Sequence, residues 1–202
     1  MDYTQDKKNI CVIGITGGIA SGKTVATTAL TQAGYTVIDA DEVSRALFAC
    51  GTDGEQSMML TFPQAVENGK LNRGALRKII AKDNEARQRL NALTHPAIVA
   101  QVKKLIAAAT PPIILSAPLL FESGLSSLCD VTVCVYCPRP IRLQRLTARD
   151  NISLEDAASI IDAQIPDAER CTIADYIVRS DREQAEFVEE VKKLIKTIIP
   201  NS

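Results

Sequence analysis

Residues 10–24, ICVIGITGGIASGKT, decide the fold of this chain. An apolar run leads into a glycine-rich turn, and Gly17, Gly22, Lys23 and Thr24 fill the spacing G-x-x-x-x-G-K-[ST] of a phosphate-binding loop. The two glycines allow turns that residues with side chains avoid, so that consecutive backbone N–H groups can converge on one anion. The stretch therefore predicts a site for nucleotide phosphates.

The residues on either side of the loop fit the order of strand, loop and helix that such a motif requires. Residues 10–15 read as a strand buried on both faces, and residues 25–30 can continue as a helix. That helix would point the positive end of its dipole at the anion, while Lys23 reaches the β- and γ-phosphates and the Thr24 hydroxyl binds Mg²⁺. The residues expected to bind ATP are Gly17, Gly18, Ile19, Ala20, Ser21, Gly22, Lys23 and Thr24.

Composition limits the class of protein. The chain has 202 residues, of which 46% are hydrophobic and 23% charged, and this suits one core with a small inserted domain. A net charge of −1 gives no support for a general nucleic-acid surface. The amino terminus MDYTQDKKN is polar, and the apolar region 105–121 is interrupted by prolines, so neither predicts a signal peptide or a membrane span. We expect a soluble, cytoplasmic protein with no nucleic acid, membrane or obligatory protein partner.

The six cysteines are expected to be reduced thiols. Three of them lie in apolar, strand-like runs, where a thiol packs as a small hydrophobic group. Cys134 and Cys137 form a C-x-x-C pair, but their segment VTVCVYC reads as a strand, and no second Cys or His pair stands at zinc spacing. A packing role is therefore favoured over a metal site for this pair.

The rest of the chain predicts an α/β fold, with a five-stranded parallel sheet flanked by helices. The further strands are expected at residues 35–38, 113–117, 131–137 and 176–178. Asp39 and Asp41 directly follow the second strand, and ligands of such sheets bind at the carboxyl ends of the strands. Either acid could instead cap the helix expected over residues 42–48, although two carboxylates are more than a cap requires.

We expect residues 1–202 to form one unit of this kind. Its core would consist of residues 10–41, 111–150 and 174–202. Residues 42–110 contain no convincing strand and predict a helical insert for the second substrate, with helices at residues 84–93 and 96–109. Residues 150–170 are polar and interrupted by a proline, which is typical of a mobile lid.

An arginine-rich stretch, PRPIRLQRLTARD, occupies residues 138–150. Arg142, Arg145 and Arg149 recur at spacings of three and four, which places them along one helix face. No acidic residue stands between Arg139 and Arg149, so these charges favour phosphate as a partner, with a solvated face as the alternative.

The layout separates kinases from other proteins with a phosphate-binding loop. No N-K-x-D sequence of the guanine-binding type occurs, which argues against a GTPase. A helical insert after the second strand and an arginine-bearing lid after the fourth match the order of elements in small-molecule kinases.

Several motifs, in one order and over nearly the whole chain, resemble the dephospho-coenzyme A kinase family. They are ITGGIASGKT, VIDAD at 37–41, GKLNRGALR at 69–77, LNALTHPAI at 90–98, PLLFE at 118–122, R-x-x-R-x-x-x-R-D ending at Asp150, and AQ…ADYIV from 163 to 178. The resemblance implies a P-loop kinase that uses ATP to phosphorylate the 3′-hydroxyl of the ribose in dephospho-coenzyme A, the last step of coenzyme A synthesis.

The resemblance also implies roles for single residues. Asp41 matches the proposed catalytic base of the family, and Asp39 would position Mg²⁺ or its waters. Arg145 matches an arginine that reaches the phosphates from the start of the lid, and Arg149 is expected to assist it in binding ATP. Lys23 keeps its catalytic role on the transferred phosphate.

This chain departs from the family pattern at three positions. Ala20 replaces the usual glycine of the loop, Ser180 stands where many members have an asparagine near the adenine, and Asp181 stands close to a usual glycine. Selectivity for the base is therefore open. The alternatives are a different small-molecule or nucleotide kinase on the same fold, and a nucleotide-binding module without turnover.

Overall fold

The computed structural model describes residues 12–199, which divide into two compact units. Residues 12–38 and 109–199 form the first, called here the core unit, and residues 39–108 form the second, called the insert unit. Residues 10 and 11, at the start of the expected first strand, lie outside the described residues, as do residues 200–202.

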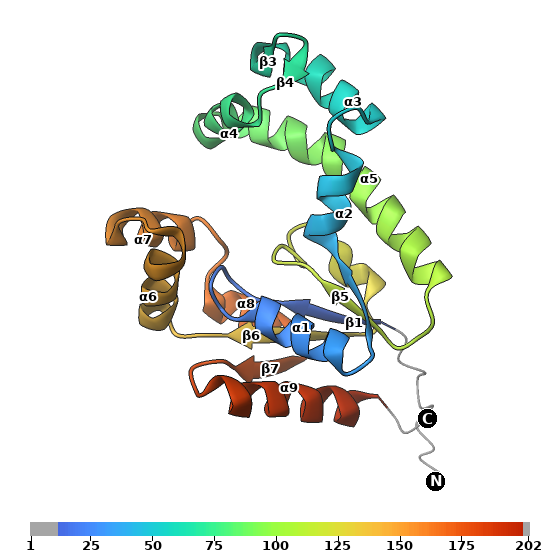
Figure 1. The fold of residues 1–202 in the computed structure, drawn as a ribbon, viewed down its shortest axis with the longest axis vertical. Helices are drawn as coiled ribbons and strands as arrows, with labels where there is room; N and C mark the ends of the chain where they lie inside the picture. Colours follow the sequence, from blue (N-terminus) through green and yellow to red (C-terminus); the bar gives the residue numbers. More distant parts are fainter. Residues whose placement is uncertain (1–11, 200–202) are drawn as a thin grey trace. The chain divides into compact units, whose positions relative to one another are not determined.

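The core unit is built on a parallel sheet with the strand order β2-β5-β1-β6-β7 (Figure 1). Its strands are β1 (Val12–Thr16), β2 (Thr36–Asp39), β5 (Ile113–Ser116), β6 (Val131–Tyr136) and β7 (Tyr176–Arg179). β1 is central and fully buried, and Ile13 pairs with Ile114 of β5 on one side and with Val131 of β6 on the other. The predicted five-stranded parallel sheet is confirmed, and its apolar runs follow from burial on both faces.

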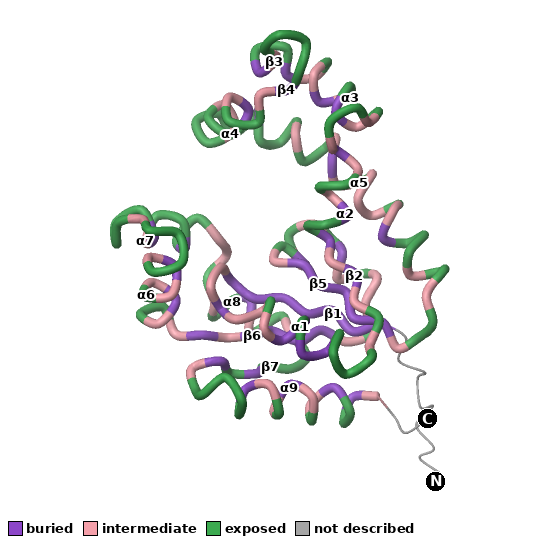
Figure 2. The backbone as a smooth tube through the Cα atoms, viewed as in Figure 1, coloured by how far each residue is buried: buried purple, intermediate pink, exposed green. Residues whose placement is uncertain are grey.

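Helices α1 and α9 contact each other against this sheet. The helical elements of the core unit are α1 (Lys23–Gln32), the short 3₁₀ helix η2 (Leu125–Leu128), α6 (Arg139–Asp150), α7 (Leu154–Asp162), α8 (Asp167–Ile173) and α9 (Gln184–Ile198). Ile13 and Ile15 of β1 share one apolar core with Leu30 of α1 and Phe187 of α9. Figure 2 shows β1 as a buried segment. This core supports the loop that joins β1 to α1.

The insert unit has an apolar core of its own. Its elements are α2 (Ala40–Leu47), α3 (Asp53–Thr61), the 3₁₀ turn η1 (Pro63–Ala65), β3 (Val66–Glu67), β4 (Lys70–Leu71), α4 (Arg73–Lys82) and α5 (Asn84–Ala108). The buried members of its core are Phe48, Met58, Phe62, Ala65, Leu71, Leu76 and Ala86. Figure 1 shows α2, α3 and α4 arranged along the long helix α5.

The expectation that the insert contains no strand was wrong. β3 and β4 form a short antiparallel hairpin, in which Val66 pairs with Leu71. Asn68 and Gly69 at its turn both have positive φ, 50° and 73°, and two consecutive residues of this kind are what a type I′ turn requires. The Asn-Gly dipeptide was the signal, but strands of only two residues are too short to show an alternating pattern.

The two helices expected at residues 84–93 and 96–109 are in fact one helix, α5, with Pro96 inside it. Proline has no N–H, so one intrahelical hydrogen bond is lost at this position. Leu90, before the proline, and Ile98, after it, pack against the same core of the insert unit. These tertiary contacts keep the helix continuous.

The five cysteines among the described residues are free thiols. Cys134 of β6 and Cys137 are buried, and the Sγ of Cys134 lies 3.9 Å from the Sγ of Cys171 in α8. Within residues 12–199, no three His, Cys, Asp or Glu side chains are grouped to hold a metal ion. No helix in this range has the length and apolar character to cross a membrane.

Candidate active site

The loop between β1 and α1 carries the residues with the most specific expected roles. α1 begins at Lys23, and Gly22 precedes it as the N-cap with φ 97°, a conformation that residues with side chains rarely adopt. The first N–H groups of any helix lack partners within that helix. The start of α1 therefore presents donors and the positive end of a dipole to an anion.

Gly17 and Gly18 are required for a different reason from the one expected. Neither has a positive φ, so the prediction that Gly17 permits a special turn was wrong. A Cβ on Gly17 would lie 2.8 Å from the backbone oxygen of Val135, and one on Gly18 would overlap the guanidinium of Arg142. These two glycines allow close packing of the loop against β6 and α6.

Lys23 extends from the loop toward the end of a neighbouring strand. Its Nζ donates a hydrogen bond to the Oγ of Ser116, the buried last residue of β5, over 2.6 Å. Lys23 is half-buried, while Thr24 beside it is exposed. Ser116 was not predicted as a site residue, although a polar residue that ends the apolar run IILS was a visible signal.

Arg145 of α6 is tied to the turn after β7. Its Nη2 donates to the backbone oxygen of Ser180 over 2.7 Å, and its Nη1 donates to the Ser180 Oγ over 3.1 Å. The same Oγ donates to the backbone oxygen of Ser21 in the loop. Ser180 therefore connects Arg145 to the phosphate-binding loop, a link that no local sequence pattern indicated.

The other two arginines of the predicted stripe have different surroundings. Arg142 is only 2% exposed and pairs with Asp167 of α8, whereas Arg149 is exposed and forms a fork with Asp150. The hydrogen bond from Arg149 lowers the pKa of the Asp150 carboxyl. Two of the three arginines thus already have acidic partners: Asp150 ends the stretch itself, and Asp167 lies 25 positions after Arg142.

Arg170, the last residue of the segment expected to be a lid, is fully buried in α8. Its Nη1 donates to the Oδ1 of Asp167 over 2.9 Å, and its Nη2 lies 3.9 Å from the Oε1 of Glu122. Glu122 thus faces a buried guanidinium rather than solvent alone. Asp167 therefore forms ion pairs with both Arg142 and Arg170.

The turn after β7 holds a second charged pair. Arg179 forks onto Asp181, with Nη2 to Oδ2 at 2.6 Å, and its guanidinium lies 5.2 Å from the ring centroid of Tyr136. The hydrogen bond from Arg179 lowers the pKa of Asp181. The turn expected near the adenine therefore carries a charged carboxylate that is already neutralised by a neighbour.

The two predicted acids, Asp39 and Asp41, belong to the insert unit. Asp39 is the N-cap of α2, and its Oδ1 accepts from the N–H groups of Asp41 at 2.9 Å and Glu42 at 3.2 Å. The capping interpretation is therefore confirmed for Asp39. Asp41 lies in the first turn of α2 and is exposed.

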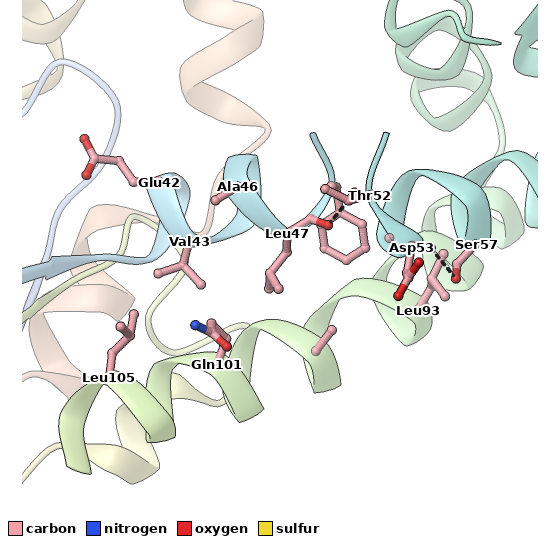
Figure 3. A pocket seen from close by; sticks show the side chains of 13 residues that line it. Glu42, Val43, Ala46, Leu47, Thr52, Asp53, Ser57, Leu93, Gln101 and Leu105 are labelled. Carbon is pink, nitrogen blue, oxygen red and sulfur yellow. Dashed lines mark hydrogen bonds between the residues drawn. The ribbon is translucent and has the colours of Figure 1, made fainter. Parts of the chain in front are cut away.

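A pocket of about 790 Å³ lies within the insert unit, between α2, α3 and α5 (Figure 3). The residues that line it are Glu42, Val43, Ala46, Leu47, Phe48, Thr52, Asp53, Gly54, Ser57, Leu93, Ala97, Gln101 and Leu105. Figure 3 shows Val43 and Leu47 pointing from α2 toward α5, from which Gln101 and Leu105 point back. Mostly apolar walls with a few polar groups are typical of a small-molecule site.

Comparison with known proteins gives the family. The family described as dephospho-CoA kinase matches residues 11–186. A dephospho-CoA kinase of Pseudoalteromonas translucida is 39% identical over 177 residues, which cover 86% of this chain and 84% of that protein.

Two solved structures are similar over almost the whole chain. A crystal structure from Thermus thermophilus has a TM-score of 0.86 and 29% identity, and covers 96% of this chain and 100% of its own. The dephospho-CoA kinase from Campylobacter jejuni has a TM-score of 0.70 and 26% identity, with coverage of 93% and 96%. With its glycine-rich loop at the carboxyl end of the central strand of a parallel sheet, this chain belongs to the dephospho-CoA kinase family.

Proposed function

We propose that this chain transfers the γ-phosphoryl group of ATP to the 3′-hydroxyl of dephospho-coenzyme A, which gives coenzyme A and ADP in the last step of coenzyme A synthesis. The observation that carries the proposal is the family match over residues 11–186, which spans both the phosphate-binding loop and the insert unit. The loop alone supports only a nucleotide phosphate site. We propose that this reaction takes place in the cytoplasm.

For the nucleotide, we assign the loop of residues 17–24 to the triphosphate of ATP. The start of α1 supplies backbone donors, and the half-buried Lys23 supplies a positive charge for the phosphoryl oxygens. Arg145 adds a charge whose guanidinium is held beside the loop through Ser180, and Arg149 adds an exposed one at the end of α6. These charges neutralise the transferred group, which is where most of the catalytic gain in phosphoryl transfer arises.

For the metal, we assign Mg²⁺ to the Thr24 hydroxyl and the Asp39 carboxylate. Hydroxyl and carboxylate oxygens are the donors that Mg²⁺ prefers, and one or two protein ligands are usual when the phosphates supply the others. This fits the described residues, which hold no dedicated cluster of three metal-binding side chains. When bound, Mg²⁺ would supply positive charge at the β- and γ-phosphates.

For the acceptor, we assign the role of base to Asp41. Its carboxylate would accept the proton of the 3′-hydroxyl, while the ribose oxygen bonds to the γ-phosphorus and the bond from that phosphorus to the β–γ bridging oxygen breaks. The exposed position of Asp41 in the first turn of α2 supports contact with a substrate.

We further propose that the chain works as one kinase unit, in which residues 42–110 bind the acceptor and residues 150–170 act as the lid. The pocket between α2, α3 and α5 supports the first assignment, because it begins at Glu42, next to Asp41. Its apolar walls suit the pantetheine arm of the acceptor, and Gln101 offers an amide to the amide groups of that arm.

Release of ADP from ATP, measured with a panel of hydroxyl acceptors, tests the proposal. We expect release with dephospho-coenzyme A and none with AMP or other acceptors. Strong turnover with another acceptor would identify a different small-molecule kinase. Nucleotide binding without turnover on any acceptor would favour a binding module.

The change Asp41→Asn tests the base. We expect loss of at least about a hundredfold in kcat, because the proton acceptor is removed, with ATP affinity unchanged. Glu85→Gln is the matched control, since Glu85 is an exposed acid in the first turn of α5. Unchanged turnover in Asp41→Asn would remove Asp41 from this role.

A further inference from the structure

Ile19 is held on both sides by side chains that lie far from it in the sequence. Its backbone N–H donates to the Oε1 of Gln164 over 2.8 Å, and its backbone oxygen accepts from the Nε of Arg142 over 2.8 Å. The Nη2 of Arg142 also donates to the Oε1 of Gln164 over 3.0 Å. The three residues therefore form a closed ring of hydrogen bonds around one residue of the phosphate-binding loop.

Arg142 is the buried member of this ring, while Ile19 and Gln164 are half-buried. Arg142 is 2% exposed, and its Nη1 pairs with Asp167, so its charge is compensated inside the protein. Its guanidinium lies directly on the backbone of Gly18, where a Cβ would overlap it. Each of its three nitrogens has a partner. Removing one partner of a buried guanidinium costs more stability than removing one partner of an exposed guanidinium.

The direction of these bonds suits a phosphate site. Where a loop cradles an anion with its N–H groups, its backbone oxygens need partners on the outside. The N–H of Ile19 is an exception in this loop, because it donates to Gln164. Arg142 donates to the backbone oxygen of Ile19, and the Ser180 hydroxyl donates to the backbone oxygen of Ser21. The N–H groups at the start of α1 are then oriented by contacts made at the outer side of the loop.

The ring also joins the loop to the lid segment. Gln164 and Asp167 belong to the stretch after α7, while Ile19 and Ala20 pack against the apolar cluster of Leu146, Ala157 and Ile161. The loop and the lid segment thus share hydrogen bonds and apolar contacts within the core unit.

We propose that Arg142 and Gln164 are positioning residues, which preset the phosphate-binding loop for ATP by holding the peptide groups on either side of Ile19. Neither residue needs to touch the nucleotide. The proposal rests on the proposed function only in taking ATP as the ligand, and it is independent of the acceptor.

The test measures binding of a non-hydrolysable ATP analogue with Mg²⁺ to the full chain by calorimetry, without acceptor. Gln164→Leu removes the shared oxygen at similar size, and we expect affinity to fall about tenfold. Gln164→Glu keeps an oxygen at the same place beside the guanidinium of Arg142, and we expect affinity within about threefold of the unmodified chain. The thermal midpoint of each variant shows that it is folded.

Arg139→Gln is the matched control, because the exposed pair of Arg139 and Asp162 also joins α6 to α7 but does not touch the loop. We expect its affinity to be unchanged. In turnover, Gln164→Leu should raise the KM for ATP about tenfold and leave kcat at saturating ATP nearly unchanged.

Two results would overturn the proposal: an affinity of Gln164→Leu within twofold of the unmodified chain, or an equal loss in Arg139→Gln. Because binding is measured without acceptor, failure of the chain to phosphorylate dephospho-coenzyme A would refute the proposed function and leave this result to be read separately.

Discussion

The core unit and the insert unit offer their proposed ligands different kinds of surface. In the core unit, polar side chains hold the phosphate-binding loop: buried Arg142 donates to the backbone oxygen of Ile19, and half-buried Lys23 donates to the side chain of Ser116. In the insert unit, a wide pocket has mainly apolar walls and few polar groups. Phosphate charge needs donors at set positions, whereas a flexible apolar arm needs mainly space and dry surface.

The largest effect should follow from breaking a polar contact of the core unit. Lys23→Met removes the ammonium that donates to Ser116. We expect kcat to fall by about 10²–10³, because the positive charge that would neutralise the transferred phosphate is lost. Lys192→Met, on the surface of α9, is the control. A kcat within threefold of the unmodified chain would show that the core unit does not depend on this charge.

Cys134 of the core unit and Cys50 of the insert unit should differ by more than a hundredfold in reactivity. Burial raises the pKa of Cys134 in the core unit to about 12, so at pH 8 only about one molecule in ten thousand carries the thiolate. Cys50 of the insert unit is exposed. Iodoacetamide labelling followed by mass spectrometry should modify Cys50 first.

The alkylation rate of Cys134 should also depend on pH. The rate at Cys134 should rise about tenfold for each unit of pH and level off only near its raised pKa, because the reactive form is the deprotonated one. In denaturant both cysteines should react quickly. Similar rates in the folded protein would contradict the burial of Cys134.

A smaller effect is expected from filling the pocket of the insert unit. Ala46→Phe adds a ring to an exposed position of its wall, and we expect the KM for dephospho-coenzyme A to rise about tenfold, with the KM for ATP unchanged. Ala100→Phe, exposed on α5 but outside the pocket, is the matched control. Steady-state kinetics with both substrates measures the two KM values. A rise in the KM for ATP instead would contradict the assignment of the acceptor to this pocket.

The smallest effect concerns strain in the loop. Ala20 has φ 59°, a conformation that costs an alanine about 1–2 kcal/mol and a glycine almost nothing. After the added entropy of glycine in the unfolded chain, Ala20→Gly should raise the free energy of unfolding by about 0.5–1 kcal/mol. Ala33→Gly, at φ −81°, should lower it. Urea denaturation measures both, and a loss in Ala20→Gly would show that the loop is unstrained.

Much of the fold could be predicted from the sequence, because its signals are local. Apolar runs predicted all five strands of the main sheet, and the spacing of Gly17, Gly22 and Lys23 predicted the loop. The errors arose where tertiary contacts override a local pattern, as at Pro96, where packing keeps α5 continuous. The two-residue strands beside Asn68 were too short to be recognised.

The site was predictable only in part. Lys23 and the loop were predicted from their motif, and Asp39 was predicted as one of two possible caps. Ser116 and Gln164 were not predicted, since a single polar residue at the end of a strand or after a helix has no pattern of its own. The roles of Asp41 and Arg145 remain predictions that come from the resemblance to a family.

The sequence by itself determined which stretches are buried strands and which loop carries the motif of a phosphate site, because each of these depends on residues close together in the chain. Only the tertiary structure decided which side chains hold that loop. Gln164 lies 145 positions from Ile19, and Arg142 lies 123 positions from it. The strand order brings them together, and no local pattern of residues encodes that order.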